Sequence, residues 1–565
     1  MLRLPAILLL SLLVALPAAA VSQPGARAEN GMVSAPERLA TEIGVEVLAT
    51  GGNAIDAAVA VTFALSVTYP QAGALGAGGF LLYRDSEAQH HALDCRETAP
   101  VNLGPELFLD EDGRPIPGLT LESGLAVGVP GLVAGLADAH GRWGSRPWAE
   151  LIQPAIRLAE DGFSVYPWLA ESIELAADRL MPDPGARKIF APGERPLRPG
   201  DALVQSDLAK TLRRIAETGP SAFYEGPVAE AVVETVQRAG GVMIAEDLAK
   251  YRATLRRPIE GSYRGHRVVT FPPPSGGGVT LLQILTTLER YDLASSGPGA
   301  SLTVHLMAEA ERRAFADRSR WLGDPDFVEV PVANLLDPHY LARRGATIRT
   351  DRATPSPSIQ PGDPLGEGPG NTLHFSATDS AGRAVAFTMT LNQWFGTGIV
   401  AEGTGVLLNN EIDDFAVAPG APNHYGLTGE GHNALAGGKR PLSSMTPTIV
   451  EPPGGGPRPL LVLGSPGGST IPTSVLQVLI NVIDHGMPLQ EAVEAPRFHH
   501  QWQPDKIRHE RRAFPSDVKV NLIARGHALE TSKGPLGNVN AIGLAPDGSW
   551  IGAADPRRGG TAAGH

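Results

Sequence analysis

The sequence contains a single cysteine, Cys95, among its 565 residues, which excludes an intrachain disulfide and a cysteine-based metal site. Aromatic residues account for only 5%, and beyond residue 20 no stretch is apolar over the roughly 20 residues that a membrane-spanning helix needs. No long run of one charge sign occurs, and the net charge of −13 disfavours nucleic acids and anionic membranes as partners. The length and composition therefore indicate a globular protein with one large domain or two to three ordinary ones. We expect Cys95 to be a buried structural residue.

The first 20 residues form a separate unit. Arg3 precedes an apolar run from Leu8 to Leu16, and Pro17 to Ala20 ends in an A-x-A pattern. This arrangement is typical of a secretory signal peptide cleaved after Ala20. The alternative, a membrane anchor, is disfavoured because the run is too short to span a bilayer. We therefore predict an exported protein, periplasmic or secreted.

Hydrophobic periodicity predicts helices in the first part of the chain and mostly strands after residue 372. The expected helices cover 39–50, 56–67, 151–160, 206–218, 228–239, 279–288, 301–321, 471–485 and 489–495, and the expected strands cover 80–83, 90–97, 384–391, 447–451, 460–463 and 541–544. The helix over 301–321 carries dense charge along one face. Helical and strand-rich parts in this order favour a layered α/β arrangement. The glycine-rich stretch 73–79 lacks the Lys-Ser/Thr of a phosphate loop, so we expect close backbone packing there.

The segment around Thr372 is the most informative stretch of the chain. A loop rich in proline and glycine ends at residue 370, and an extended segment begins at Thr372. If the chain were cut before Thr372, this residue would carry a free α-amine beside its hydroxyl, and so a base and a nucleophile together. An α-amine titrates near pH 7.7–8.0, so a fraction is free base at neutral pH. On the local pattern alone, a threonine that opens a strand is ordinary.

A series of motifs in chain order carries a resemblance to a known family. They are G-G-N-A-I-D-A-A-V-A at 51–60, L-D-C-R-E-T-A-P at 93–100, P-W-A-E-L-I-Q-P-A-I at 147–156, A-D-R-S-R-W-L-G-D-P-D-F at 316–327, N-T-L-H-F-S at 371–376, T-L-N at 390–392, F-G-T-G at 395–398, L-L-N-N-E-I-D-D-F at 407–415, P-L-S-S-M-T-P-T at 441–448, G-S-P-G-G-S at 464–469 and A-P-R-F-H-H-Q-W at 495–502. The sequence resembles γ-glutamyltranspeptidase (glutathione hydrolase), an N-terminal-nucleophile hydrolase family, over nearly the whole mature chain.

The resemblance implies a fold and a processing step. The fold is a four-layer αββα sandwich. Self-cleavage before Thr372 is expected to give a large subunit, residues 21–371, and a small catalytic subunit, residues 372–565, which together form one intertwined domain. The implied substrates are glutathione and related γ-glutamyl compounds, with water, amino acids or dipeptides as acceptors, and no cofactor is required.

The resemblance also implies catalytic roles. Thr372 Oγ attacks the γ-glutamyl amide and forms an acyl-threonine, which water or an acceptor amine resolves. Gly467 and Gly468 match the pair whose backbone N–H groups bind the oxyanion, a role that typically contributes about 100- to 1,000-fold in rate. Thr390 matches a threonine that lies near the nucleophile and assists self-cleavage. Without the resemblance, Pro-Gly-Gly after a strand is most simply an ordinary turn.

The same matching implies how the glutamyl α-carboxylate and α-ammonium are bound. Arg96 matches the arginine that binds the carboxylate, which a guanidinium can do with two parallel hydrogen bonds. The hydroxyls of Ser443 and Ser444 match additional donors. For the ammonium and the lid, the matching residues are Asn392, Glu411, Asp414 and Tyr425, the last expected to hydrogen-bond to Asn392. Taken alone, residues 411–414 also fit a metal site or a solvated acidic turn.

Two departures from the family pattern leave alternatives open. Leu373 stands where a hydroxyl residue is usual, and Gln393-Trp394 replaces small polar residues, which can narrow the leaving-group or acceptor side. His374 matches a histidine of the motif and is interpreted as structural, because the α-amine already provides a base.

The alternative functions are a glutaryl or cephalosporin acylase of the same superfamily, transfer on poly-γ-glutamate, and an inactive exported binding protein. The charges of Glu411 and Asp414 favour a γ-glutamyl donor over a glutaryl donor.

Overall fold

Two seven-stranded sheets stacked face to face form the centre of the protein. The computed structural model describes residues 24–359, 372–418, 423–427 and 431–565, so the predicted signal peptide lies outside the described residues. The first sheet, here called the nucleophile sheet, contains in order β21 (Thr561–Gly564), β2 (Met32–Ala35), β10 (Leu373–Thr378), β11 (Ala384–Thr390), β3 (Gly78–Arg84), β4 (His90–Cys95) and β7 (Thr254–Arg256). The facing sheet contains β1 (Ala26–Ala28), β20 (Trp550–Ala554), β19 (Asn540–Leu544), β15 (Leu461–Gly464), β14 (Thr448–Glu451), β9 (His266–Thr270) and β8 (Ile259–Tyr263).

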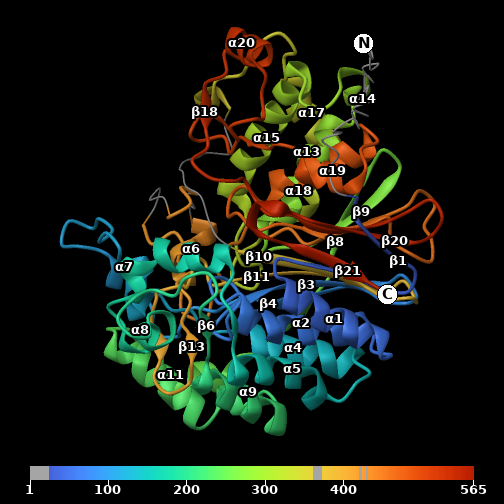
Figure 1. The fold of residues 1–565 in the computed structure, drawn as a ribbon. Helices are drawn as coiled ribbons and strands as arrows, with labels where there is room; N and C mark the ends of the chain where they lie inside the picture. Colours follow the sequence, from blue (N-terminus) through green and yellow to red (C-terminus); the bar gives the residue numbers. More distant parts are fainter. Residues whose placement is uncertain (1–23, 360–371, 419–422, 428–430) are drawn as a thin grey trace, which may run out of the picture.

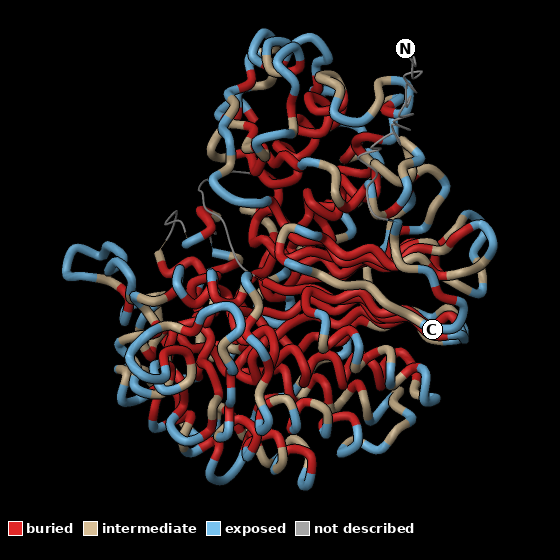
Figure 2. The backbone as a smooth tube through the Cα atoms, viewed as in Figure 1, coloured by how far each residue is buried: buried red, intermediate tan, exposed pale blue. Residues whose placement is uncertain are grey.

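Helices cover the outer face of each sheet, so the predicted αββα sandwich is confirmed (Figure 1). Against the nucleophile sheet lie α1 (Arg38–Ala49), α2 (Ala54–Thr68) and α4 (Leu132–Trp143), with α5 (Trp148–Asp161), α9 (Ser206–Thr218) and α11 (Pro227–Arg238) further out. Against the facing sheet lie α13 (Gly276–Leu288), α18 (Ile471–Ile483) and α19 (Leu489–Glu494), with α15 (Ser301–Trp321) packed on α13 and α20 (Ser516–Ala524) packed on α15. Between the sheets, Phe80 and Phe271 pack with their ring centroids 4.4 Å apart. The buried residues form three apolar layers, which appear as the red interior of Figure 2.

The central helix of the first layer is α2, and its sequence explains both its start and its burial. Asn53 caps the helix by accepting hydrogen bonds from the backbone N–H groups of Ile55 and Asp56, and Asp56 bonds back to the Asn53 N–H at 2.9 Å. Every residue of the helix is buried. Small Ala and Val side chains allow this, because they let α1, α5 and the sheet approach closely. The glycine stretch 73–79 acts in the same way: a Cβ on Gly76 would lie 2.0 Å from the carbonyl oxygen of Leu407.

Strand β10 directs alternate side chains to different layers, as strand geometry requires. Leu373 and Phe375 point into the helical layer, where a Cβ on Gly73 would lie 2.7 Å from Leu373 Cδ2. His374 and Ser376 point into the space between the sheets, where the Ser376 hydroxyl donates to the carbonyl oxygen of Val462 at 3.2 Å. The Leu373 side chain is therefore part of the core.

Strands from before and after Thr372 are interleaved in both sheets. In the nucleophile sheet β2 lies between β21 and β10, and β11 pairs with β3. In the facing sheet β1 pairs with β20, and β14 pairs with β9. The two ends of the described chain also meet, because the Asn30 N–H donates to the His565 carbonyl oxygen at 2.9 Å. A cut before Thr372 would leave two fragments that share both sheets.

The predicted helices and strands are present, with ends displaced by a few residues, as is usual for element boundaries. The predicted charge on α15 is present, and the charged side chains between residues 309 and 318 are buried. They have partners inside: Arg313 donates to Glu309 at 2.8 Å, and Arg312 donates to Ser356 Oγ at 2.7 Å. Thr354 Oγ1 donates to Glu309 at 2.6 Å. The buried charges thus anchor the segment that leads toward the predicted cleavage point.

His374 provides a test of this packing through pH. Both of its ring nitrogens are engaged, Nδ1 with Thr388 at 2.8 Å and Nε2 with Ser376 at 3.1 Å, and burial lowers the pKa of the ring to about 3. In the unfolded chain a histidine titrates near 6.5, so below that pH the unfolded state binds the extra proton. The stability that the neutral ring provides is complete above pH 6.5 and is lost as the pH falls.

We expect the free energy of unfolding of the wild type, relative to His374→Asn, to fall by about 2 kcal/mol between pH 7.5 and 5.0. Urea denaturation of both proteins at the two pH values measures this difference. Taking the difference cancels the titration of the other buried groups. A difference that stays constant or grows toward low pH would contradict a neutral, buried His374.

Candidate active site

A narrow cavity at the end of β10 contains every predicted site residue except Gly467. The predicted residues that line it are Arg96, Thr372, Thr390, Asn392, Glu411, Asp414, Tyr425, Ser443, Ser444 and Gly468. They come from seven separate segments of the chain. The free space is about 10 Å³, which is room for a single water molecule. Because a glutamyl group needs far more room, its binding requires the lining side chains to move apart.

Thr372 lies directly before β10 and is 5% exposed. Leu373 pairs with Met389 in the β10–β11 ladder, and the same register continued by one residue places Thr372 opposite Thr390. Thr390 Oγ1 accepts a hydrogen bond from the Asn392 N–H at 2.8 Å. The nucleophile candidate is therefore held on a rigid antiparallel pair of strands. Its preceding residue, Asn371, lies outside the described residues.

Gly467 and Gly468 form the turn between β15 and α18, and both have positive φ angles, 134° and 55°. Only glycine adopts such conformations freely, and a Cβ on Gly467 would lie 2.3 Å from Thr470 Oγ1. In the described part of the chain, neither amide N–H donates to another residue. Two unused N–H groups at the edge of the nucleophile cavity are what binding of an oxyanion requires.

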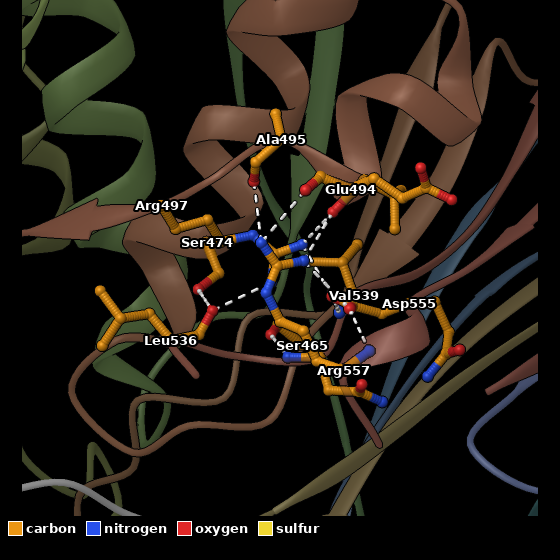
Figure 3. Close-up of polar contacts among 12 residues, drawn as sticks. Ser465, Ser474, Glu494, Ala495, Arg497, Leu536, Val539, Asp555 and Arg557 are labelled. Atoms are coloured by element: carbon orange, nitrogen blue, oxygen red, sulfur yellow. Dashed lines mark hydrogen bonds and ion pairs between the residues drawn. The ribbon is translucent and has the colours of Figure 1, made fainter. Parts of the chain in front are cut away.

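The glycine turn is supported by a buried network of charges (Figure 3). Arg497 pairs with Asp555 at 2.8 Å and donates to the Leu536 carbonyl oxygen at 2.9 Å. Asp555 accepts from the Val539 N–H at 2.9 Å, and Ser465 Oγ accepts from the Asn538 N–H at 3.0 Å. This network joins the segment before the glycines to residues 536–539 and to the end of β20. These buried ion pairs and hydrogen bonds therefore fix the position of the glycine turn.

Arg96 is fully buried and is surrounded by carboxylates. It donates to Glu411, and its Nη2 lies 2.5 Å from Asp414 Oδ2. Burial acts to lower the pKa of Arg96, but Glu411 and Asp414 raise it above its usual value, so the guanidinium is charged. The predicted carboxylate binder and the two predicted ammonium binders thus pair with one another. A zwitterion can replace this pairing by supplying one charge of each sign.

Two further charged residues belong to this cluster, and neither is among the site residues predicted from the sequence. Glu97 lies 3.5 Å from Arg96, and burial raises its pKa to about 7. Arg318 donates to Ser444 Oγ at 2.9 Å, and burial lowers its pKa to about 10. Both lie inside motifs that carry the family resemblance, at 93–100 and 316–327, so the signal was present in the sequence. Arg318 positions the Ser444 hydroxyl, while Ser443 is held by a hydrogen bond from its N–H to the Pro274 carbonyl oxygen at 2.9 Å.

Asn392 links the cavity to the segment that covers it. Its φ of 71° is unusual for a residue other than glycine, and such strain is typical of functional sites. Tyr425 donates to the Asn392 carbonyl oxygen at 2.7 Å and also contacts Asn392 Oδ1, so the expected contact between these residues is present. The neighbouring residue His424 donates its N–H to Asp413 at 2.8 Å, and Asn423 donates to Asp414 at 3.0 Å. Residues 423 and 424 of the predicted lid are therefore hydrogen-bonded to Asp414 and Asp413, and Asp414 in turn contacts Arg96.

Within the described ranges, no three His, Cys, Asp or Glu side chains are grouped as metal ligands would be. The helices among these residues include none that is both long and apolar enough to cross a membrane. Cys95 is buried and its thiol donates to the Gly79 carbonyl oxygen at 3.1 Å, as expected for a structural residue.

Comparison with known proteins places this geometry in a family. The family described as "Gamma-glutamyltranspeptidase" matches residues 40–565. Among curated proteins, the "Glutathione hydrolase proenzyme" of Escherichia coli (strain K12) is 47% identical, with 94% of this chain and 91% of the relative covered. The "Acylase ACY 1 proenzyme" of Pseudomonas sp. (strain SE83) is 41% identical, covering 95% and 94%. A solved structure described as cephalosporin acylase from Bacillus halodurans superposes with a TM-score of 0.86 at 30% identity, covering 99% of both chains. With this match in sequence and in overall fold, the chain belongs to the γ-glutamyltranspeptidase family of N-terminal-nucleophile hydrolases.

Proposed function

We propose that this protein cleaves the γ-glutamyl amide bond of glutathione and related compounds and transfers the γ-glutamyl group to water or to an amine. The observation that carries the proposal is the single cavity that joins Thr372 to Arg96, Glu411 and Asp414, with Gly468 at its edge. The chain first cuts itself between Asn371 and Thr372. The products are a large subunit, residues 21–371, and a small catalytic subunit, residues 372–565, which remain interleaved.

The reaction uses both groups of the new N-terminal residue. The α-amine of Thr372 takes the hydroxyl proton while Oγ attacks the γ-carbonyl carbon. The resulting oxyanion is bound by the N–H groups of Gly467 and Gly468. The C–N bond then breaks, the amine leaves with the proton, and an acyl-threonine remains. Water or an acceptor amine attacks this ester, and the hydroxyl of Thr372 is regenerated.

Donor recognition follows from the charges in the cavity. The α-carboxylate takes the place of Glu411 and Asp414 on Arg96, and the hydroxyls of Ser443 and Ser444 add hydrogen bonds. The α-ammonium pairs with the two released carboxylates. Each charge of the donor takes over one side of the contacts between Arg96 and these carboxylates, so neither the guanidinium nor the donor's charges are left buried without a partner.

The acylase function is the second candidate, since relatives with that name share this fold. A glutaryl group has no ammonium, so it would bind Arg96 and leave Glu411 and Asp414 uncompensated. The cost of such an unpaired buried charge is several kcal/mol, which favours a γ-glutamyl donor. The third candidate is an inactive binding protein, and the residue that favours it is Leu373, because a hydroxyl residue is usual there. The Leu373 side chain, however, packs in the core against Gly73, away from the cavity.

A direct comparison of donors tests the proposal. We expect the purified protein to run as two bands, to show Thr-Leu-His-Phe at the start of the smaller one, and to hydrolyse γ-glutamyl-4-nitroanilide. Its kcat/KM for the glutaryl anilide should be lower by about a hundredfold or more, because several kcal/mol of pairing are lost. Equal turnover of both anilides would favour the acylase, and a single inactive band would favour the binding protein.

We also propose that the protein is exported, to the periplasm or the medium. This proposal rests on the pattern of residues 1–20, which is typical of a cleaved signal peptide.

A further inference from the structure

A second, larger cavity of about 550 Å³ adjoins the nucleophile cavity. Two chain segments contribute adjacent residues to both. Gly467 and Thr470 line the larger cavity while Gly468 lines the nucleophile cavity, and His424 lines the larger one next to Tyr425 in the other. Because Arg96 and its carboxylates line the nucleophile cavity and not the larger one, the larger cavity is available to the other half of a substrate. Under the function proposed above, it receives the amine half: the leaving group, and then the acceptor.

The wall of this larger cavity contains a buried arginine, Arg558, whose guanidinium makes no hydrogen bond or ion pair with any residue that the structure describes, although the charge of Asp555 acts on it. Arg558 is 7% exposed, and its Nε has no hydrogen-bond partner. Its guanidinium carbon lies 5.7 Å from the ring centre of Trp168 and 5.6 Å from that of Trp394. Within the described residues, these ring contacts are its only direct interactions, and no carboxylate pairs with it. Asp555, the acid nearest in sequence, is already bound by Arg497 and Arg557.

A guanidinium in this setting favours an anionic ligand. Burial lowers the pKa of Arg558, but an arginine is still charged at neutral pH. Cation–π contacts orient the guanidinium and leave its N–H donors unused. A carboxylate is the natural complement, because it can accept two parallel hydrogen bonds from the guanidinium fork. The same wall also contains Lys506, which pairs with Glu530 at 3.2 Å, and the exposed Lys533.

We propose that Arg558, held between Trp168 and Trp394, binds a carboxylate of the amine half of the substrate. The preferred leaving groups and acceptors are then amines that carry a free carboxylate, such as α-amino acids and short peptides with an unmodified C-terminus. This assignment also gives Trp394 a role. Trp394 departs from the family pattern, and its ring forms one side of the proposed site. Arg558 acts on the amine half alone and takes no part in binding the γ-glutamyl group.

The test compares substrates that differ only in that carboxylate. The donor pair is γ-glutamyl-3-carboxy-4-nitroanilide and γ-glutamyl-4-nitroanilide, and the acceptor pair is glycylglycine and glycylglycine amide. We expect the wild type to prefer the carboxylated member of each pair. Arg558→Leu should reduce that preference about tenfold or more, while hydrolysis of the plain anilide without acceptor stays within about twofold of wild type.

Two further variants separate the site from general electrostatics and from misfolding. Lys533→Ala removes an exposed charge from the same cavity and should leave the preference unchanged. Arg558→Lys retains the charge without the fork and should give an intermediate preference, which can be measured even if Arg558→Leu does not fold. The inference is overturned if the Arg558 variants keep the wild-type preference, or if Lys533→Ala lowers it equally. A wild type that cleaves the plain anilide without any carboxylate preference overturns this inference alone, whereas one that cleaves no γ-glutamyl anilide overturns the proposed function as well.

Discussion

Thr372→Ala is expected to remain a single uncut chain and to lose γ-glutamyl turnover by at least about 10⁴-fold. The hydroxyl of Thr372 is needed twice, first to attack the preceding peptide bond and then to attack the donor. Removal of the nucleophile in a hydrolase of this kind leaves only the rate supplied by binding and the oxyanion site, which explains the size of the effect. The side chain lies at the end of a rigid strand pair, so its loss should not disturb the fold. A denaturing gel and the hydrolysis of γ-glutamyl-4-nitroanilide measure both consequences.

Thr372→Ser is the matched control, since it retains the hydroxyl and loses only a methyl group. It should be cut, although more slowly, and should retain measurable turnover. If Thr372→Ala were processed into the same two fragments, the cut would be made by another group, and the role of Thr372 in maturation would be wrong.

Asp414→Asn is expected to lower kcat/KM for γ-glutamyl-4-nitroanilide by about a hundredfold or more and to leave glutaryl turnover unchanged or slightly improved. The substitution removes one of the two carboxylates that pair with the donor's ammonium, in a site where burial makes an unpaired charge costly. It also removes the partner of Arg96 at 2.5 Å, so Arg96 is more available to a carboxylate. Both effects shift the preference from a γ-glutamyl to a glutaryl donor.

The neighbouring residue gives the control for this prediction. Asp413 accepts from Thr120 at 2.7 Å and from the His424 N–H at 2.8 Å, and has no contact with Arg96. Asp413→Asn should therefore affect both donors by the same factor, through the lid. If Asp414→Asn also lowered both donors equally, Asp414 would support the fold or the nucleophile, and its assignment to the ammonium would be wrong.

The sequence could identify the site residues one by one, but it could not predict how they pair. Arg96 and Glu411 are 315 residues apart, and neither periodicity nor a local motif shows that these two side chains form an ion pair. The same limit applies to α15. Its sequence predicts a charged helix face, but the burial of these charges depends on partners from other segments, such as Thr354 and Asp505. Local patterns predict helices and strands because those depend on neighbouring residues.

Arg558 shows a further limit of sequence reasoning. In the chain it is one of two adjacent arginines near the C-terminus. Arg557 has Glu510 and Asp555 as partners, whereas Arg558 faces two tryptophans that come from positions 168 and 394. Only the three-dimensional arrangement separates a structural arginine from a candidate binding residue.

The meeting of the chain ends beside β2 implies that maturation and catalysis can be separated genetically. Because Asn30 and His565 are hydrogen-bonded neighbours, a short peptide could join His565 to the segment before Asn30, and closely spaced ends are the condition under which circular permutation is tolerated. A permuted gene that opens the chain before Thr372 would then place this threonine directly after the initiator methionine. Once that methionine is removed, the amine of Thr372 would be free without any autoproteolysis. Self-cleavage would then be only one of two routes to the same N-terminus, and the catalytic step could be studied in a protein that does not process itself.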